Sequence, residues 1–279
     1  MAQRHILLTD CDDSEGLVAL ISTELFKRKV NILSNREFVD PATGRFFMRT
    51  EYTGQADNSE LLEALKKILP SNATVRLAPK SKKRLVVLAT KEPHCLGDLL
   101  IRCEYNNLNA TIEAVIANRA ALGPLVEKFK VPFHLVSHSG KERLEHALLM
   151  ADIIDSYNPD YIVLAKYMRI LPLEFVNRYT NRIINIHHSF LPAFIGANPY
   201  KQAYERGVKI IGATAHFVTG DLDQGPIIEQ DVISTNHRMT SQLMSKAGKD
   251  VEKIVLARAV DNVVNDRVFV SLNKTVIFD

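Results

Sequence analysis

The chain has 279 residues, which at the usual domain size of roughly 100 to 200 residues is enough for two domains. Hydrophobic residues make up 46% and charged residues 24% of it, as in globular proteins rather than disordered or fibrous ones. The formal net charge of +3, from 35 basic and 32 acidic residues, is too small to indicate a face that binds nucleic acid.

The first residues and the cysteines indicate a compartment. The segment MAQRHILLTDCDDSEG reaches acidic residues within about a dozen positions and has no apolar core before a cleavage site, so we expect no secretory signal. No apolar run is long enough to span a bilayer. Cys11, Cys95 and Cys103 are too scattered for a disulfide framework or a zinc site. We therefore expect a cytoplasmic protein with no membrane partner and no metal.

The first eighty or so residues predict a small antiparallel sheet. Short apolar runs indicate strands at 4–9, 31–39, 45–53 and 73–78. The middle pair reads as a hairpin, because Pro41 favours the start of a turn and Gly44 allows a positive φ. Apolar residues at helical spacing begin at Leu17 and again after Ser59, whose hydroxyl we expect to cap the second helix. The resulting order β-α-β-β-α-β is typical of a ferredoxin-like domain.

From Arg84 onward, strands alternate with helices, which predicts a parallel sheet with right-handed crossovers. Candidate strands lie at 85–89, 111–117, 132–136, 161–165, 183–187, 210–218 and 226–233. Candidate helices lie at 96–103, 141–157 and 241–264. The sequence thus predicts an α/β chain with a ferredoxin-like domain and its linker at 1–83, followed by a doubly wound, Rossmann-like domain at 84–279.

Polar residues gather where two of the predicted strands end, which is where open parallel sheets bind ligands. Asn185 and His187 flank Ile186, so in extended backbone both side chains face the same side of the sheet. Together with Asp223, they could donate to a developing oxyanion and take a proton from water, without a metal or a covalent intermediate. Spacing alone favours the alternative, in which the first two bond locally and Asp223 is a turn residue.

The longer stretch IINIHHSFLPAFIGANPYKQAYERGVKIIGATAHFVTGDLDQGPIIEQD resembles the catalytic signature of folate-dependent formyltransferases. The match is ordered, with Asn-x-His, Ser-x-Leu-Pro, His-Phe-Val and Asp-x-Gly-Pro in turn, and the upstream AKYMRIL resembles the folate-side strand end of that family. The resemblance covers residues 84 to about 264. It implies that Asn185 and His187 polarise the formyl oxygen, that Asp223 organises water and proton transfer, and that His216 supports the loop. It implies further that the pterin pocket is bordered by Met168, Arg169, Leu171, Val218 and Thr219.

The whole chain resembles the formyltetrahydrofolate deformylases, which join an amino-acid-binding ACT domain to a formyltransferase-like domain. Asp10, Gly16, Leu17 and Asn31 are similar to the effector-binding pattern of ACT domains, although Asp12 stands where the family commonly has Pro. The resemblance implies hydrolysis of 10-formyltetrahydrofolate to formate and tetrahydrofolate, with this folate as substrate and no cofactor. It also implies regulation by a small amino acid such as methionine or glycine, and a homo-oligomer.

Two other functions share parts of this pattern. A folate-dependent transferase to an amine acceptor would use the same catalytic residues, but glycinamide ribonucleotide formyltransferases carry a Gly-Ser-Asn phosphate loop where this chain has TKEPHCLGD. Methionyl-tRNA formyltransferases add a basic C-terminal domain, which we do not expect here. A non-catalytic, amino-acid-responsive regulator would not need Asn185, His187 and Asp223 together. The lack of Gly-x-Gly-x-x-Gly in the first loop argues against a nicotinamide cofactor.

Overall fold

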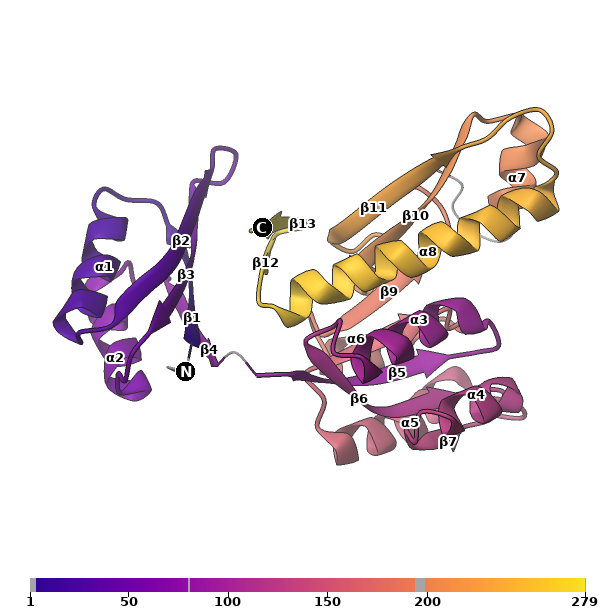
Figure 1. Cartoon of the computed structure of the whole chain (residues 1–279), viewed down its shortest axis with the longest axis horizontal. Helices are drawn as coiled ribbons and strands as arrows, with labels where there is room; N and C mark the ends of the chain where they lie inside the picture. The colour runs from indigo at the N-terminus through magenta and orange to yellow at the C-terminus, as the bar shows by residue number, and fades with distance from the viewer. Residues whose placement is uncertain (1–3, 80, 194–198, 279) are drawn as a thin grey trace. The chain divides into compact units, whose positions relative to one another are not determined.

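The computed structural model describes residues 4–79, 81–193 and 199–278, which form two compact units (Figure 1). The first unit extends to Ser81 and also includes Asn265–Phe269 and residues 276–278, whereas the second comprises Lys82–Val264 and Val270–Thr275. The sequence pattern had instead assigned all of 84–279 to one domain. Lys80, in the predicted linker, lies outside the described residues.

The first unit is a four-stranded sheet with all neighbours antiparallel, in the order β2-β3-β1-β4. Its strands are β1 (Arg4–Asp12), β2 (Asn31–Asp40), β3 (Arg45–Thr53) and β4 (Thr74–Pro79). Helices α1 (Leu17–Lys27) and α2 (Asn58–Ile68) pack on one face around Leu7, Ile21 and Leu65. The predicted ferredoxin-like order is confirmed.

The start of α2 differs from the prediction. Asp57, not Ser59, is the N-cap, and its Oδ1 accepts hydrogen bonds of 2.9 Å from the backbone N–H groups of Ser59 and Glu60. The two side chains compete for the same free amides, and a carboxylate accepts more strongly and also favours the positive end of the helix dipole. The helix therefore begins one residue before Ser59, at Asn58.

The other face of this sheet is covered by the C-terminal residues of the chain. Phe269 and Phe278 pack against Ile6, Leu8 and Phe47, and the rings of Phe47 and Phe269 lie 5.5 Å apart in an edge-to-face arrangement. The short strands β12 (Val268–Ser271) and β13 (Lys274–Ile277), which sequence analysis missed, carry these residues or flank them. The apolar C-terminus therefore belongs with this sheet because it supplies the second half of its core.

A buried arginine of the first sheet holds the segment that precedes β12 in place. Arg49 on β3 donates from Nε to the carbonyl oxygen of Asp266 at 2.9 Å and from Nη2 to that of Asn265 at 3.1 Å. The carboxylate of Asp266 also accepts from Arg76 on β4 at 3.0 Å. These bonds hold the chain just beyond the last long helix against the sheet.

The second unit contains a seven-stranded sheet in the order β11-β10-β9-β8-β5-β6-β7. Its strands are β5 (Lys83–Ala89), β6 (Ala110–Ala117), β7 (Phe133–Leu135), β8 (Tyr161–Ala165), β9 (Ile183–His187), β10 (Ile210–Phe217) and β11 (Ile227–Ser234). Pairing is parallel from β9 through β7, as predicted, but β10 runs antiparallel to both β9 and β11. Residues 218–226 join β10 to β11, and this connection is too short for a crossover between parallel strands.

Helices cover this sheet and complete the Rossmann-like arrangement. They are α3 (Pro93–Glu104), α4 (Gly123–Glu127), α5 (Arg143–Tyr157), α6 (Leu173–Arg178), α7 (Pro199–Arg206) and α8 (Ser241–Val264). Helices α5 and α6 pack on buried strand residues such as Val86 and Ile162, while α8 packs along β9, β10 and β11 and against α3 (Figure 1). No helix of the described residues is both long and apolar enough to cross a membrane.

The order of the strands fixes where a ligand can bind. From the central strand β5 the chain adds β6 and β7 on one side and then β8 and β9 on the other. The loops that follow β5 and β8 consequently diverge, and open α/β sheets bind their ligands at such a switch point. A site is therefore expected beyond the carboxyl ends of β5 and β8, next to β9.

We predict that Phe269→Ala lowers the free energy of unfolding by about 3 kcal/mol, because it leaves a cavity between the C-terminus and the first sheet. The side chain of Phe269 is only 8% exposed. Phe26→Ala is the matched control, since Phe26 is 80% exposed and should change stability by less than about 0.5 kcal/mol. Urea unfolding followed by circular dichroism measures both, and equal effects would contradict the assigned packing.

Candidate active site

A cavity of about 440 Å³ opens at the carboxyl ends of β8 and β9. It is lined by all nine residues that sequence analysis assigned to catalysis, loop support and folate binding, namely Asn185, His187, Asp223, His216, Met168, Arg169, Leu171, Val218 and Thr219. The structure thus brings the whole predicted set to one place. The role of each residue stays a prediction.

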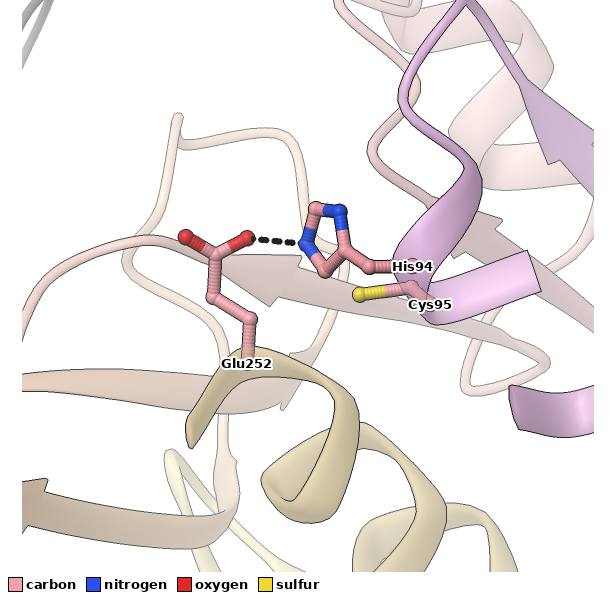
Figure 2. Close-up of side chains that lie close together, drawn as sticks. All are labelled: His94, Cys95 and Glu252. Atoms are coloured by element: carbon pink, nitrogen blue, oxygen red, sulfur yellow. Dashed lines mark hydrogen bonds and ion pairs between the residues drawn. The ribbon is translucent and has the colours of Figure 1, made fainter. Parts of the chain in front are cut away.

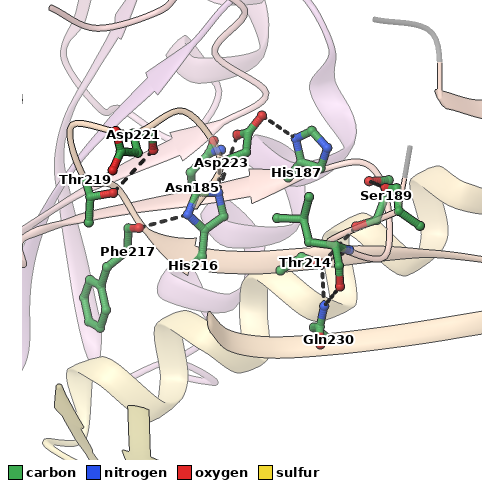
Figure 3. Close-up of polar contacts among 12 residues, drawn as sticks. Asn185, His187, Ser189, Thr214, His216, Phe217, Thr219, Asp221, Asp223 and Gln230 are labelled. Carbon is green, nitrogen blue, oxygen red and sulfur yellow. Dashed lines mark hydrogen bonds and ion pairs between the residues drawn. The ribbon is translucent and has the colours of Figure 1, made fainter. Parts of the chain in front are cut away.

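The register of β9 against β10 sets the geometry of the catalytic residues. Asn185 lies opposite His216, and the Nδ2 of Asn185 is 3.2 Å from the Nε2 of His216 (Figure 3). The other ring nitrogen of His216, Nδ1, lies 2.9 Å from the carbonyl oxygen of Phe217 and donates to it. The Nε2 of His216 then accepts one amide hydrogen of Asn185, which leaves the second amide hydrogen for a ligand.

Asp223 lies in the loop between β10 and β11 with a positive φ of 56°. Its Oδ2 is 3.2 Å from the Nδ1 of His187, and its Oδ1 is 3.7 Å from the Nε2 of His216. Burial raises the pKa of Asp223, but the hydrogen bond from His187 and the nearby ring of His216 lower it more, so its pKa lies well below the ordinary value. A strained backbone held at a partly buried, ionised carboxylate is typical of a functional position.

Among the described residues, one ring nitrogen of His187 has a hydrogen-bond partner and the other has none. Its Nδ1 donates to Asp223, while its buried Nε2 has no hydrogen-bond partner among the described residues. A buried polar atom without a partner is costly in a folded protein and commonly marks a ligand contact. Because Nδ1 is directed to Asp223, Nε2 is the ring nitrogen that is left to contact a ligand in the cavity.

The backbone after His187 is held by hydrogen bonds to the hydroxyl of Thr214, a residue that sequence analysis missed. Thr214 on β10 is fully buried and lies opposite His187. Its hydroxyl donates to the carbonyl oxygen of Ser189 at 2.9 Å and accepts from the N–H of Leu191 at 3.0 Å and from the Nε2 of Gln230 at 2.9 Å (Figure 3). A threonine among the small and apolar residues that precede His216 in β10 was the signal that could have found these contacts.

On the folate side, three of the five predicted residues present backbone or apolar surface. Met168 is exposed at the cavity, and its N–H donates to the hydroxyl of Thr90 at 3.0 Å. Leu171 and Val218 pack against the core of the second unit. This part of the cavity therefore offers apolar walls with few free side-chain donors, as suits an aromatic ring.

The polar residues of the folate side are partly engaged. Arg169 donates from Nη2 to the carbonyl oxygen of Lys141 at 3.1 Å, which holds its guanidinium beside α5. The hydroxyl of Thr219 donates to the carbonyl oxygen of Asp221 at 3.3 Å and braces the loop that carries Asp223. Both residues shape the cavity while retaining spare hydrogen-bonding capacity.

In the first unit, three of the four predicted effector residues lie near one end of the sheet. Asp10, near the end of β1, is ion-paired with Arg45. Gly16 caps the start of α1 with a φ of 84°, a conformation that favours glycine. Leu17, the first residue of α1, is buried in the core, so it offers its backbone rather than its side chain. These residues surround a strand end and a helix N-terminus.

The fourth effector residue, Asn31, lies at the opposite end of the same sheet. It pairs with Thr53 on β3, whereas Asp10 pairs with Phe47 on that strand. Six residues of strand separate these two rungs, which amounts to roughly 20 Å. Within one chain, Asn31 and Asp10 therefore do not share a pocket. The hairpin register causes this separation, and the linear pattern did not reveal it.

Comparisons with known proteins show which family this chain belongs to. The formyl transferase family model matches residues 83–260. A relative from Haemophilus influenzae named formyltetrahydrofolate deformylase is 57% identical over 277 residues, which cover 99% of this chain and all of that protein. The chain belongs to the formyltetrahydrofolate deformylase family.

Solved structures separate this deformylase family from the transferases. A crystal structure of a formyltetrahydrofolate deformylase from Pseudomonas syringae pv. tomato matches with a TM-score of 0.96 and 40% identity, covering 100% of this chain and 95% of that one. A glycinamide ribonucleotide transformylase 1 from Symbiobacterium toebii matches with a TM-score of 0.68 and 28% identity, covering 71% of this chain and 95% of that one. The deformylase structure covers the whole length of this chain, whereas the transformylase structure covers about seven tenths of it.

We predict that Thr214→Val destabilises the fold by about 1 to 3 kcal/mol, because it keeps the shape of the residue but leaves buried backbone groups without partners. Thr180→Val is the control, since Thr180 is exposed and its hydroxyl makes a single local bond to the carbonyl oxygen of Asn177. The free energy of unfolding in urea measures the difference. If the two variants had equal free energies of unfolding, the hydrogen bonds of Thr214 would not contribute to the stability of the fold.

Proposed function

We propose that this chain hydrolyses 10-formyltetrahydrofolate to formate and tetrahydrofolate. The observation that carries the proposal is the arrangement of Asn185, His187 and Asp223 around one cavity, in a chain that matches proteins named for this reaction along nearly its whole length. The reaction consumes only the folate and water, so we propose that it needs no cofactor and no metal. All three cysteines are free thiols, which supports a cytoplasmic setting.

In the proposed reaction, water attacks the formyl carbon, and the carbonyl oxygen becomes negatively charged. The free amide hydrogen of Asn185 and a proton on the Nε2 of His187 stabilise this oxyanion. The bond between the formyl carbon and the folate N10 then breaks as N10 takes up a proton. One proton of water thus ends on N10, and the other is released when formic acid ionises.

Asp223 has two tasks in this scheme. It organises the attacking water and helps its proton to leave, as the family resemblance implies. Its lowered pKa makes it a weak base in the resting site, so its larger effect is to hold His187 in the orientation that presents Nε2. As the oxyanion forms, the negative charge of Asp223 also stabilises the protonated imidazole.

We predict that Asn185→Ala and Asp223→Asn each lower kcat for formate release by about a hundredfold, with a much smaller change in KM for the folate. Both groups act mainly in the transition state, when charge develops on the formyl oxygen. Asp221→Asn is the control, because Asp221 lines the same cavity but is exposed. Near-normal turnover of either catalytic variant would remove that residue from its proposed role.

For the first unit, we infer that residues 1–83 bind a small amino acid such as methionine or glycine and regulate the catalytic residues of 84–279. Asp10, Gly16 and Leu17 are the proposed contacts, at the end of β1 and the start of α1. In the described sheet, β2 is an edge strand with one side unpaired. It exposes apolar side chains at Ile32, Leu33, Phe38 and Val39. This edge supports the proposal that the chain forms a homo-oligomer.

We predict that methionine or glycine changes the affinity for the folate by about 5- to 150-fold, the usual range of coupling between two sites. Linkage requires that the folate change the affinity for the amino acid by the same factor. Calorimetric titration with and without a non-reactive folate measures both directions, with the other amino acids as controls. If no amino acid binds, or if binding leaves the folate affinity unchanged, the regulatory proposal is wrong.

A further inference from the structure

A second cavity of about 380 Å³ adjoins the catalytic one and shares Lys166 with it. Glu252, from the middle of α8, lines this second cavity although its side chain is only 1% exposed. Its Oε1 accepts from the hydroxyl of Tyr200 at 2.6 Å. Its Oε2 lies 2.8 Å from the Nε2 of His94 and 3.2 Å from the Nζ of Lys166. Glu252 therefore receives three internal donors.

Lys166 reaches this carboxylate from a strained position. It directly follows β8, at the carboxyl end of the sheet, and has a positive φ of 60°. Its side chain is only 8% exposed, so a charged amine is removed from water there. Glycine would occupy this backbone position without strain, and an apolar residue would be buried at lower cost. An outlier kept at such a position indicates a function for the side chain.

A metal ion is a less suitable occupant of this cluster than the lysine. His94, Cys95 and Glu252 each offer one ligand atom, and these atoms lie within 4.8 Å of one another. Figure 2 shows the three side chains close together, with the contact between His94 and Glu252 marked. Burial and the charge of Glu252 raise the pKa of Cys95, so its sulfur is a thiol rather than the thiolate that binds metals. The ammonium of Lys166 already supplies positive charge beside Oε2 of Glu252. The cluster is thus neutralised by a cation of the chain itself.

This neutralisation has a chemical consequence for the neighbouring site. A transferase has to hold the amine or the hydroxyl groups of a second substrate beside the formyl carbon, and a carboxylate on that side is well suited to do so. In this chain the oxygens of Glu252 are occupied by Lys166, His94 and Tyr200. The Lys166 side chain also takes space that the two cavities share.

We propose that Lys166 is a specificity-determining residue, whose ammonium occupies the acceptor side of the active site and pairs with Glu252, so that water alone reaches the formyl carbon. This proposal rests on the proposed hydrolysis. The buried ion pair is a second reason, besides the missing phosphate loop, why a second substrate is not held on the acceptor side.

The test measures how the formyl group of labelled 10-formyltetrahydrofolate divides between water and the small amine glycinamide. Lys166→Gly removes the side chain and suits the positive φ, and the double variant Lys166→Gly/Glu252→Gln avoids leaving a buried charge unpaired. We expect the ratio of formylglycinamide to formate to rise at least about tenfold in both variants. The KM for the folate should change little. Lys91→Ala is the matched control, because Lys91 lines the same cavity but is exposed and should keep the ratio of the parent chain.

Three results would overturn the proposal. The first is a parent-like ratio in variants whose thermal unfolding shows that they are folded. The second is loss of both products in folded variants, which would make Lys166 part of the chemistry rather than of acceptor choice. The third needs no variant, namely formylglycinamide formed by the parent chain at high glycinamide concentration. A parent chain that released no formate would instead contradict the proposed hydrolysis.

Discussion

The hydrogen-bonded pairing of β9 with β10 is the constraint on which the candidate site depends. It sets Asn185 opposite His216 and His187 opposite Thr214, and it starts the loop that returns Asp223 to both histidines. Side chains alternate along a strand, so a slip of one residue would turn His216 to the other face of the sheet. One register therefore aligns the oxyanion donors, orients the imidazole and anchors the backbone beyond it.

The two cavities are each organised around a buried carboxylate with a lowered pKa. Asp223 is held by histidines, which leave a donor free for reacting oxygen, whereas Glu252 is held by Lys166, His94 and Tyr200 and has no such opening. For Glu252, burial raises the pKa, but the hydrogen bond from His94 and the charge of Lys166 bring it down to about 2. Similar electrostatics thus serve a carboxylate that takes part in the proposed reaction and a carboxylate that is held by internal partners.

Much of this site could be predicted from the sequence because its signals are local. Alternation along β9 put Asn185 and His187 on one side, and the ordered motifs brought Asp223 to the same cavity. Other features depend on pairing between distant residues. Local pattern does not encode the direction of β10 or the hairpin register that separates Asn31 from Asp10. The meeting of Lys166 with Glu252 likewise joins a strand end to a helix much later in the chain, and neither residue stands out in its own segment.

The chain passes between its two units four times, after Ser81, Val264, Phe269 and Thr275. The first unit therefore combines residues 4–79 with residues 265–269 and 276–278, and its core is complete only when synthesis has reached Phe278. A nascent chain can form α1, α2 and the four strands early, but it must wait for the last residues before it can cover the second apolar face. In evolution, a module built this way is not gained or lost by a single fusion or cut, since either event would leave the aromatic residues of the C-terminus without the surface that buries them.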